Sequence, residues 1–239
     1  MKRFFTILFL GFVLGLSFAY RVQIYNFYND YYNNQKSLNV FEDSENKDPN
    51  AIGFEPEYHS TEFPYGNIKF VKNSNQIPIA EDMVMTDENE FNDYAHKYND
   101  VLCKSFSLPQ VKSIQEIIIS DCSGFGDGEC GLCSTVTSSS SRGGTRVTSS
   151  ILIAARHPDH IRSLLHECCH ALYFNNLDLF NREFKDRWNN CSGFVTDYAG
   201  TNIEEDFAET GSFYLSNSDA GDALEKISLF KEFYLKTKQ

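Results

Sequence analysis

Apolar residues recur along this chain with two periods, one typical of helices and one typical of strands. Helical spacing runs through residues 91–102 and 161–174. Short runs rich in β-branched residues, at 114–119 and 147–155, are typical of strands. The pattern predicts an α+β fold with three further helices, at residues 177–188, from Thr201 or Asn202 to about Leu215, and at 220–235.

The N-terminal third of the chain shows little of this periodicity. Residues 20–78 are rich in Asn, Tyr, Asp and Glu and contain no apolar run long enough for a core. We predict a poorly structured N-terminal region there, serving as a propeptide or a stalk. A cysteine-switch propeptide is not expected, because no cysteine precedes Cys103. The folded domain is predicted at residues 79–239, about 160 residues, which suffices for one core.

Residues 1–19 have the features of a targeting segment. Lys2 and Arg3 precede an apolar stretch that ends in Ser17-Phe18-Ala19, a small-x-small cleavage site. The stretch is shorter than the roughly 20 residues that comfortably span a bilayer. We therefore predict a signal peptide, with an uncleaved signal anchor as the alternative that would attach the protein to a membrane. Both predict a secreted or extracytoplasmic protein.

The charge balance is acidic. The chain has 21 basic and 33 acidic residues, a formal net charge of −12, which becomes −14 when the signal segment with its two basic residues is removed. Nucleic-acid binding requires basic patches, so it is not expected. The charge is compatible with basic substrates but does not identify one. The sequence makes no prediction of oligomeric state.

Seven cysteines follow the signal segment. In an exported protein they favour disulfides, and the odd number leaves one thiol over or pairs it with another chain. A second metal site in the Gly-rich stretch 122–144 would lack an evident fourth ligand, so a disulfide that closes this loop is the better prediction. The cysteines next to one another in the helical run are predicted as small buried residues or disulfide partners. The pairing stays open for Cys103, Cys122, Cys130, Cys133, Cys168, Cys169 and Cys191.

The motif His166-Glu167-Cys168-Cys169-His170 lies inside the helical run at residues 161–174. Positions four apart share one face of a helix, so His166 and His170 can direct two imidazoles at one metal ion. Zn²⁺ binds imidazole nitrogen readily, and catalytic zinc sites use three protein ligands and a water molecule. Glu167 stands beside them as the base for that water. The motif predicts a zinc metallopeptidase.

A third ligand is expected from the segment that begins at Tyr198. Glu205 and Glu209 are four residues apart on one face of the predicted helix. Acidic residues also stabilise the first turn of a helix through its dipole, which accounts for Glu204 and Asp206. It accounts less well for Glu209, which lies beyond the first turn among apolar neighbours.

Together, the HExxH motif and the later Tyr-x-x-Thr-Asn-x-x-Glu-x-Phe-Ala-Glu pattern resemble the gluzincin metallopeptidases, most of all the family of the anthrax lethal factor catalytic domain. The resemblance covers residues 164–214. It implies a zincin-like domain with a small sheet, an HExxH active-site helix and a C-terminal helical part. It also implies that Glu205 is the third zinc ligand, Tyr198 the oxyanion stabiliser, and Glu209 a residue that orients a histidine ring or the tyrosine.

Two features depart from that family. Cysteines occupy the middle of the motif, and 35 residues separate His170 from Glu205, more than in thermolysin-like enzymes. Glu204 is a rival ligand, but it points about 100° away from Glu205 on a helix, so only one of them can face the metal.

The sequence thus predicts a secreted metallopeptidase that holds one Zn²⁺ per chain and hydrolyses a peptide or protein, with an endopeptidase preferred to an exopeptidase. The alternatives are an inactive zincin-fold binding protein and a secreted toxin or effector protease. The strand at residues 147–155 has two possible roles. It is either an edge strand that pairs with an extended substrate or a central strand of the core.

Overall fold

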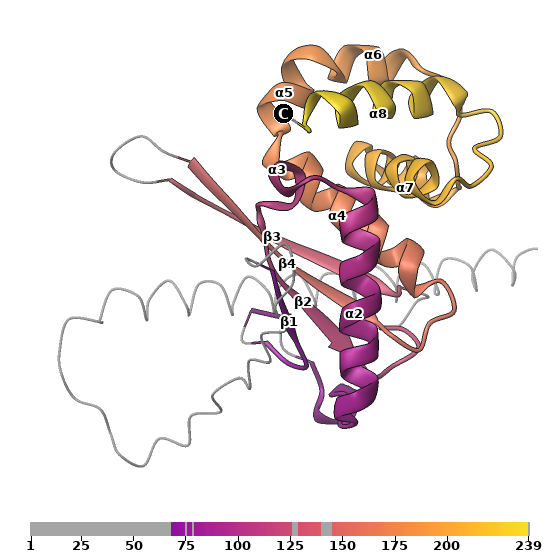
Figure 1. The fold of residues 1–239 in the computed structure, drawn as a ribbon. Helices are drawn as coiled ribbons and strands as arrows, with labels where there is room; N and C mark the ends of the chain where they lie inside the picture. The colour runs from indigo at the N-terminus through magenta and orange to yellow at the C-terminus, as the bar shows by residue number, and fades with distance from the viewer. Residues whose placement is uncertain (1–67, 75, 78, 126–128, 140–144, 239) are drawn as a thin grey trace, which may run out of the picture. The chain divides into compact units, whose positions relative to one another are not determined.

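The computed structural model describes residues 68–238, except residues 75, 78, 126–128 and 140–144. The predicted signal segment, residues 1–19, and residues 20–67 of the predicted N-terminal region lie outside the described residues. In the described part, a four-stranded sheet and seven α-helices form a mixed fold, which confirms the predicted α+β class (Figure 1). No helix in this part of the chain has both the length and the apolar character needed to cross a membrane.

The sheet contains three parallel strands and one antiparallel strand. Its order is β1-β2-β4-β3, with β1, β2 and β4 parallel and β3 antiparallel to β4. Alternate residues of the central strands, such as Ile117 of β2 and Ile151 of β4, face the main core and are completely buried. The strands are β1 (Lys69–Val71), β2 (Ile114–Ser120), β3 (Gly131–Ser139) and β4 (Thr145–Ala154).

The edge of the sheet that matters for the site is β3. Strand β4 has β2 on one side and β3 on the other, so the structure assigns residues 147–155 to the central position and corrects the edge-strand alternative. β3 lies within residues 122–144, which the sequence predicted as a loop. That prediction was wrong because β3 is rich in Ser and Thr and only half-buried, so it lacks the apolar signal of a core strand.

Strand β1 precedes the predicted start of the domain at Ile79. Phe70 pairs with Ile117 of β2, and Phe70 and Val71 are buried. The folded part of the chain therefore includes residues that the pattern assigned to the N-terminal region. Three residues are too few to show a period, which is why the sequence did not reveal this strand.

Helices α2 (Glu88–Ser105) and α4 (His160–Asn175) pack on one face of the sheet, in the main core. The Asp87 carboxylate caps α2, because it accepts hydrogen bonds from the backbone N–H groups of Asn89 and Glu90. α4 contacts β3 and β4 on one side and helix α7 (Ile203–Ser216) on the other (Figure 1). It therefore lies between the sheet and the C-terminal helices.

The C-terminal helices surround a cluster of aromatic rings. Helices α5 (Leu177–Glu183) and α6 (Lys185–Asn190) replace the single helix predicted at 177–188, with the break at Phe184. Helix α8 (Leu224–Lys236) is joined to the short helix α3 (Leu108–Val111) by a 2.8 Å hydrogen bond from Gln110 Nε2 to the Tyr234 carbonyl. Neighbouring ring centroids are 5.0–6.0 Å apart among Phe180, Phe184, Trp188, Phe207, Phe230 and Phe233.

Candidate functional site

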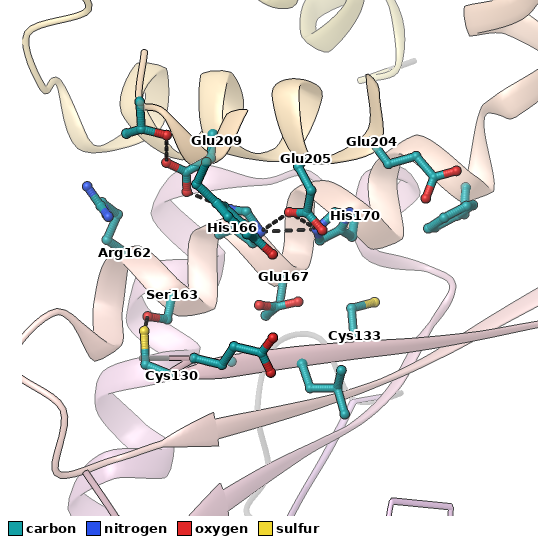
Figure 2. A pocket seen from close by; sticks show the side chains of 16 residues that line it. Cys130, Cys133, Arg162, Ser163, His166, Glu167, His170, Glu204, Glu205 and Glu209 are labelled. Carbon is teal, nitrogen blue, oxygen red and sulfur yellow. Dashed lines mark hydrogen bonds and ion pairs between the residues drawn. The ribbon is translucent and has the colours of Figure 1, made fainter. Parts of the chain in front are cut away.

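Two histidines and one carboxylate meet between α4 and α7. His166 and His170 lie one turn apart on α4, and their Nε2 atoms are 3.0 Å apart. Glu205, in the first turn of α7, places Oε2 3.1 Å from His166 Nε2 and 3.2 Å from His170 Nε2 (Figure 2). The three atoms that the sequence predicted as one set therefore form a nearly equilateral triangle.

The triangle has nearly the size that zinc requires. Zn²⁺ binds imidazole nitrogen and carboxylate oxygen at about 2.0–2.2 Å, so tetrahedral geometry sets two donors about 3.3–3.5 Å apart. The observed separations of 3.0–3.2 Å are slightly shorter, and a small outward movement of the side chains would accommodate the ion. Two imidazoles and one carboxylate are also a donor set that suits zinc. These residues fit a zinc ion.

Glu167 is a second carboxylate near the two imidazoles. Potential ligand atoms of His166, Glu167 and His170 lie within 4.8 Å of one another. Glu205 is the better third ligand, because its Oε2 is within 3.2 Å of both Nε2 atoms. The Glu167 side chain instead faces β3, where a Cβ at Gly131 would lie only 2.5 Å from its Oε1. Glu167 is therefore not needed as the third ligand of a metal ion bound at this site.

The start of α7 determines which glutamate faces the histidines. Asn202 caps the helix, and its Oδ1 accepts hydrogen bonds of 2.9 Å from the N–H groups of Glu204 and Glu205. Glu205 is half-buried and faces α4, whereas Glu204 is exposed. Asn202 is one of the two caps predicted from the sequence. The cap fixes the register in which Glu205, and not Glu204, meets the histidines.

The electrostatics of the cluster favour a positive charge. Burial by itself would lower the pKa of His166, but the carboxylates of Glu205 and Glu209 outweigh burial and raise it. Burial likewise opposes ionisation of Glu205, yet its contacts with His166 and His170 hold the pKa of Glu205 well below the ordinary value. A divalent cation would satisfy these carboxylates directly, with the imidazoles neutral.

Glu209 contacts the side of His166 that faces away from His170. Its Oε1 lies 2.9 Å from His166 Nδ1, although the ring is not aligned for a hydrogen bond. Its Oε2 accepts a 2.8 Å hydrogen bond from Thr196 Oγ1, which itself accepts one from the Ala199 N–H. Of the two orienting roles left open for Glu209, the structure brings it to the histidine. A carboxylate on the second nitrogen of a metal-binding histidine fixes the orientation of the ring.

Glu167 lies in a confined space between α4 and β3. Its side chain is buried, and burial raises its pKa. The carboxylate fits there because residue 131 of β3 is glycine, and any Cβ would overlap it. A buried carboxylate with a raised pKa beside two imidazoles has the properties of a general base.

Tyr198 lies at the mouth of the site. It begins the 3-10 helix η2 (Tyr198–Thr201), is 45% exposed, and its ring centroid lies 6.1 Å from that of His166. The Thr201 hydroxyl donates a hydrogen bond to the Tyr198 carbonyl, which fixes the turn. Partial burial and the neighbouring Glu205 carboxylate raise the pKa of the phenol, so it stays protonated and can donate a hydrogen bond.

Comparison of the chain with protein-family models, with curated proteins and with solved structures finds no match. The function is therefore inferred from the site itself and from the cleft above it.

A cleft of about 520 Å³ opens over the cluster. Besides the predicted residues, its lining includes residues 129–133 together with Arg162, Ser163, Phe174 and Thr196. The sequence motif did not single these out. A helical signal existed for two of them, because Arg162 and Phe174 lie four residues before His166 and four after His170. The strand residues and Thr196 reach the cleft only through the tertiary fold.

The predicted disulfides are absent from the structure, in which all seven cysteines are free. For Cys130 and Cys133, the distance between their Cα atoms explains why they form no disulfide. They lie three positions apart in extended chain, about 10 Å from Cα to Cα, and a disulfide needs about 4.4–6.8 Å. Cys168 and Cys169 are buried core residues, one of the two roles predicted for them. The described residues contain no second cluster of three metal-binding side chains.

Proposed function

We propose that this protein is a zinc metallopeptidase with a zincin-like domain of the gluzincin type. The triangle formed by His166, His170 and Glu205 carries the proposal, because three protein ligands leave zinc one open position. Structural zinc sites are instead closed by four protein ligands. The resemblance of residues 164–214 to the lethal factor catalytic domain family supports the same assignment.

Each protein group has a role in peptide hydrolysis under this proposal. Zinc, when bound, supplies a Lewis acid for the scissile carbonyl and lowers the pKa of a water molecule toward neutrality. The Glu167 carboxylate accepts the proton of that water and delivers it to the leaving amine. The Tyr198 hydroxyl donates a hydrogen bond to the carbonyl oxygen as negative charge develops on it. Glu209, held by Thr196, keeps the His166 ring in place.

An extended peptide is the substrate that this cleft favours. β3 is an edge strand, and residues 129–133 at its start line the cleft. A peptide that pairs with this edge through its main chain would pass over Glu167 and the histidines. With a net charge of −12, nucleic acid remains an unfavourable partner. Export through residues 1–19, and membrane attachment if they are not cleaved, remain predictions.

Glu167→Gln tests the proposal, because glutamine keeps the shape of the side chain and cannot act as the base. We expect cleavage of a peptide library to fall by at least about 100-fold, the scale of general acid–base catalysis. Zinc content by elemental analysis should stay at one ion per chain. Glu225→Gln, which removes an exposed carboxylate outside the cleft, is the matched control.

Wild-type cleavage rates in Glu167→Gln would contradict the proposed chemistry. Zinc bound to the wild-type protein without cleavage of any peptide would indicate a binding protein with a zincin-like fold instead.

A further inference from the structure

The cleft carries an uneven distribution of charge. Five glutamates line it, and Arg162 is the only Lys or Arg among its described lining residues. Arg162 lies at the opposite end of the cluster from Glu204 (Figure 2). Because the protein has a large excess of carboxylates, a single guanidinium at one end of the cleft calls for an explanation.

The Arg162 guanidinium does not stabilise the fold through an ion pair with another described residue. Its guanidinium makes no ion pair or hydrogen bond with another described residue. Its Cζ lies 5.3 Å from the centroid of the Phe213 ring, a cation–π contact with helix α7. The nearby Glu209 carboxylate is already used by His166 and Thr196. The donors of Arg162 are thus available to a ligand in the cleft.

The helix fixes the distance of Arg162 from the reaction centre. Arg162 lies four residues before His166, on the stripe of α4 that carries both histidines. One turn of helix is about 5.4 Å along the axis, and an extended peptide advances about 3.3 Å per residue. A group bound by Arg162 therefore belongs one or two residues from the scissile bond.

The direction of β3 decides which side of the scissile bond this is. Directly before the strand, Cys130 Sγ lies 2.8 Å from Ser163 Oγ, next to Arg162, and Gly131, the first residue of the strand, lies against Glu167. β3 thus runs from the Arg162 end of the cleft toward the histidines. Antiparallel pairing is the slightly more stable mode, and it places the C-terminal side of a bound peptide at Arg162.

We propose that Arg162 binds a carboxylate of the substrate, one or two residues to the C-terminal side of the scissile bond. This rests on the proposed peptidase function. The C-terminal carboxylate of a short peptide has the right charge at the right end. An Asp or Glu side chain at the same place offers the same chemistry. The planar guanidinium can bind either one through two parallel N–H···O hydrogen bonds.

Matched peptides distinguish the two sources of the carboxylate. Three peptides share one cleavable sequence and end two residues after the scissile bond. The first has a free C-terminal carboxylate, the second has a C-terminal amide, and the third has the amide with Asp as its last residue. The wild-type protein should cleave at least one carboxylate peptide with a kcat/KM about 10- to 100-fold above the neutral amide peptide, the range for a hydrogen bond between charged groups.

Arg162→Gln should bring that ratio close to 1, and Arg162→Lys should restore it only in part, because lysine keeps the charge but loses the planar fork. Arg146→Gln, which removes an exposed arginine outside the cleft, is the control and should keep the wild-type ratio. Preference for the free carboxylate assigns a C-terminal exopeptidase, and preference for the Asp peptide assigns an endopeptidase selective for acidic residues.

Binding provides a second readout that does not depend on turnover. The Kd values of the same peptides, carrying a fluorophore at the N-terminus, are measured by anisotropy on zinc-loaded Glu167→Gln with and without Arg162→Gln. The carboxylate peptide should bind more tightly than the amide only when Arg162 is present. Cleavage of all three peptides at equal rates would overturn the role of Arg162 and leave the peptidase standing. Failure to cleave or bind any peptide would overturn both.

Discussion

Residue 131 of strand β3 must be glycine, because the carboxylate of Glu167 occupies the space that any larger side chain would need. A Cβ there would lie 2.5 Å from Oε1 and 2.8 Å from Cγ of Glu167. The end of a glutamate side chain is flexible, so the carboxylate would move before the strand did. The backbone of β3 therefore limits where the proposed base can stand.

Gly131→Ala should lower kcat by about 100-fold, because a misplacement of about 1 Å has an effect of this size on a reacting group. Zinc content should not change, since the three atoms nearest to a Cβ at residue 131 all belong to Glu167 and not to a proposed ligand. Gly200→Ala is the control, because its Cβ would make only ordinary contacts of 3.8 Å with Phe194. Steady-state kinetics and elemental analysis test this, and an unchanged kcat in Gly131→Ala would show that β3 does not position the base.

The sequence could predict the residues that carry donor atoms, but only some of the residues that hold those donors in place. His166 and His170 are four residues apart on one helix, so their spacing alone predicts a shared face, and Glu167 is next to His166 in the sequence. Gly131 and Thr196 come from distant segments, and a glycine or a threonine has no chemical signature of such a role. Glu209 is intermediate, because helical spacing placed it beside Glu205 but did not decide which ring it contacts.

At the scale of elements, the prediction succeeded where one face of an element is strongly apolar. The predicted elements correspond to α2, β2, β4, α4, α7 and α8, each within a few residues. β3 was missed because Ser and Thr make up five of its nine residues, so no clear apolar alternation appears. The cleft depends on this missed strand, and for that reason the sequence could not place the substrate.

The packing of α7 on α4 joins the two halves of the site, and Gly211 permits it. A Cβ at residue 211 would lie 2.5 Å from Cys169 Sγ and 2.6 Å from the Phe230 ring. α7 carries Glu205 and Glu209, and α4 carries both histidines. The separation of the two helices therefore sets the size of the triangle of donor atoms.

Gly211→Ala should destabilise the protein by about 1–3 kcal/mol, the usual effect of overpacking a core. In an isolated helix the same change stabilises the helix by about 1 kcal/mol. A decrease in the free energy of unfolding would therefore show that the close packing around residue 211 outweighs the helix propensity of alanine. The free energy of unfolding from urea denaturation is the measurement. A stability equal to or above that of the wild type would contradict the close packing of α7 on α4.

At the scale of the whole molecule, the fold creates the site by bringing together three segments that are separated in the sequence. These are residues 129–133, 162–170 and 196–209. Beneath it, Cys168 and Cys169 are 1% and 0% exposed, and burial raises the pKa of both thiols well above the ordinary value. Their reactivity therefore reports on unfolding of the domain as a whole.

A thiol reagent applied to the native protein should label Cys103 and Cys191, which are partly exposed, much faster than Cys168 and Cys169. The two buried thiols should react only as denaturant unfolds the domain, and mass spectrometry after a short labelling pulse follows each site. Rapid labelling of either buried cysteine in the native protein, or a disulfide that includes one of them, would contradict the described core.

The central claim is that His166, His170 and Glu205 together hold one zinc ion that cleaves peptides. Its most direct test is the zinc content of the wild type, Glu205→Ala and Glu204→Ala by elemental analysis, each with a peptide-library cleavage assay. We predict one zinc ion per chain and chelator-sensitive cleavage in the wild type and in Glu204→Ala, and the loss of both in Glu205→Ala. A wild-type protein without zinc, or Glu205→Ala with its zinc retained, would contradict the claim.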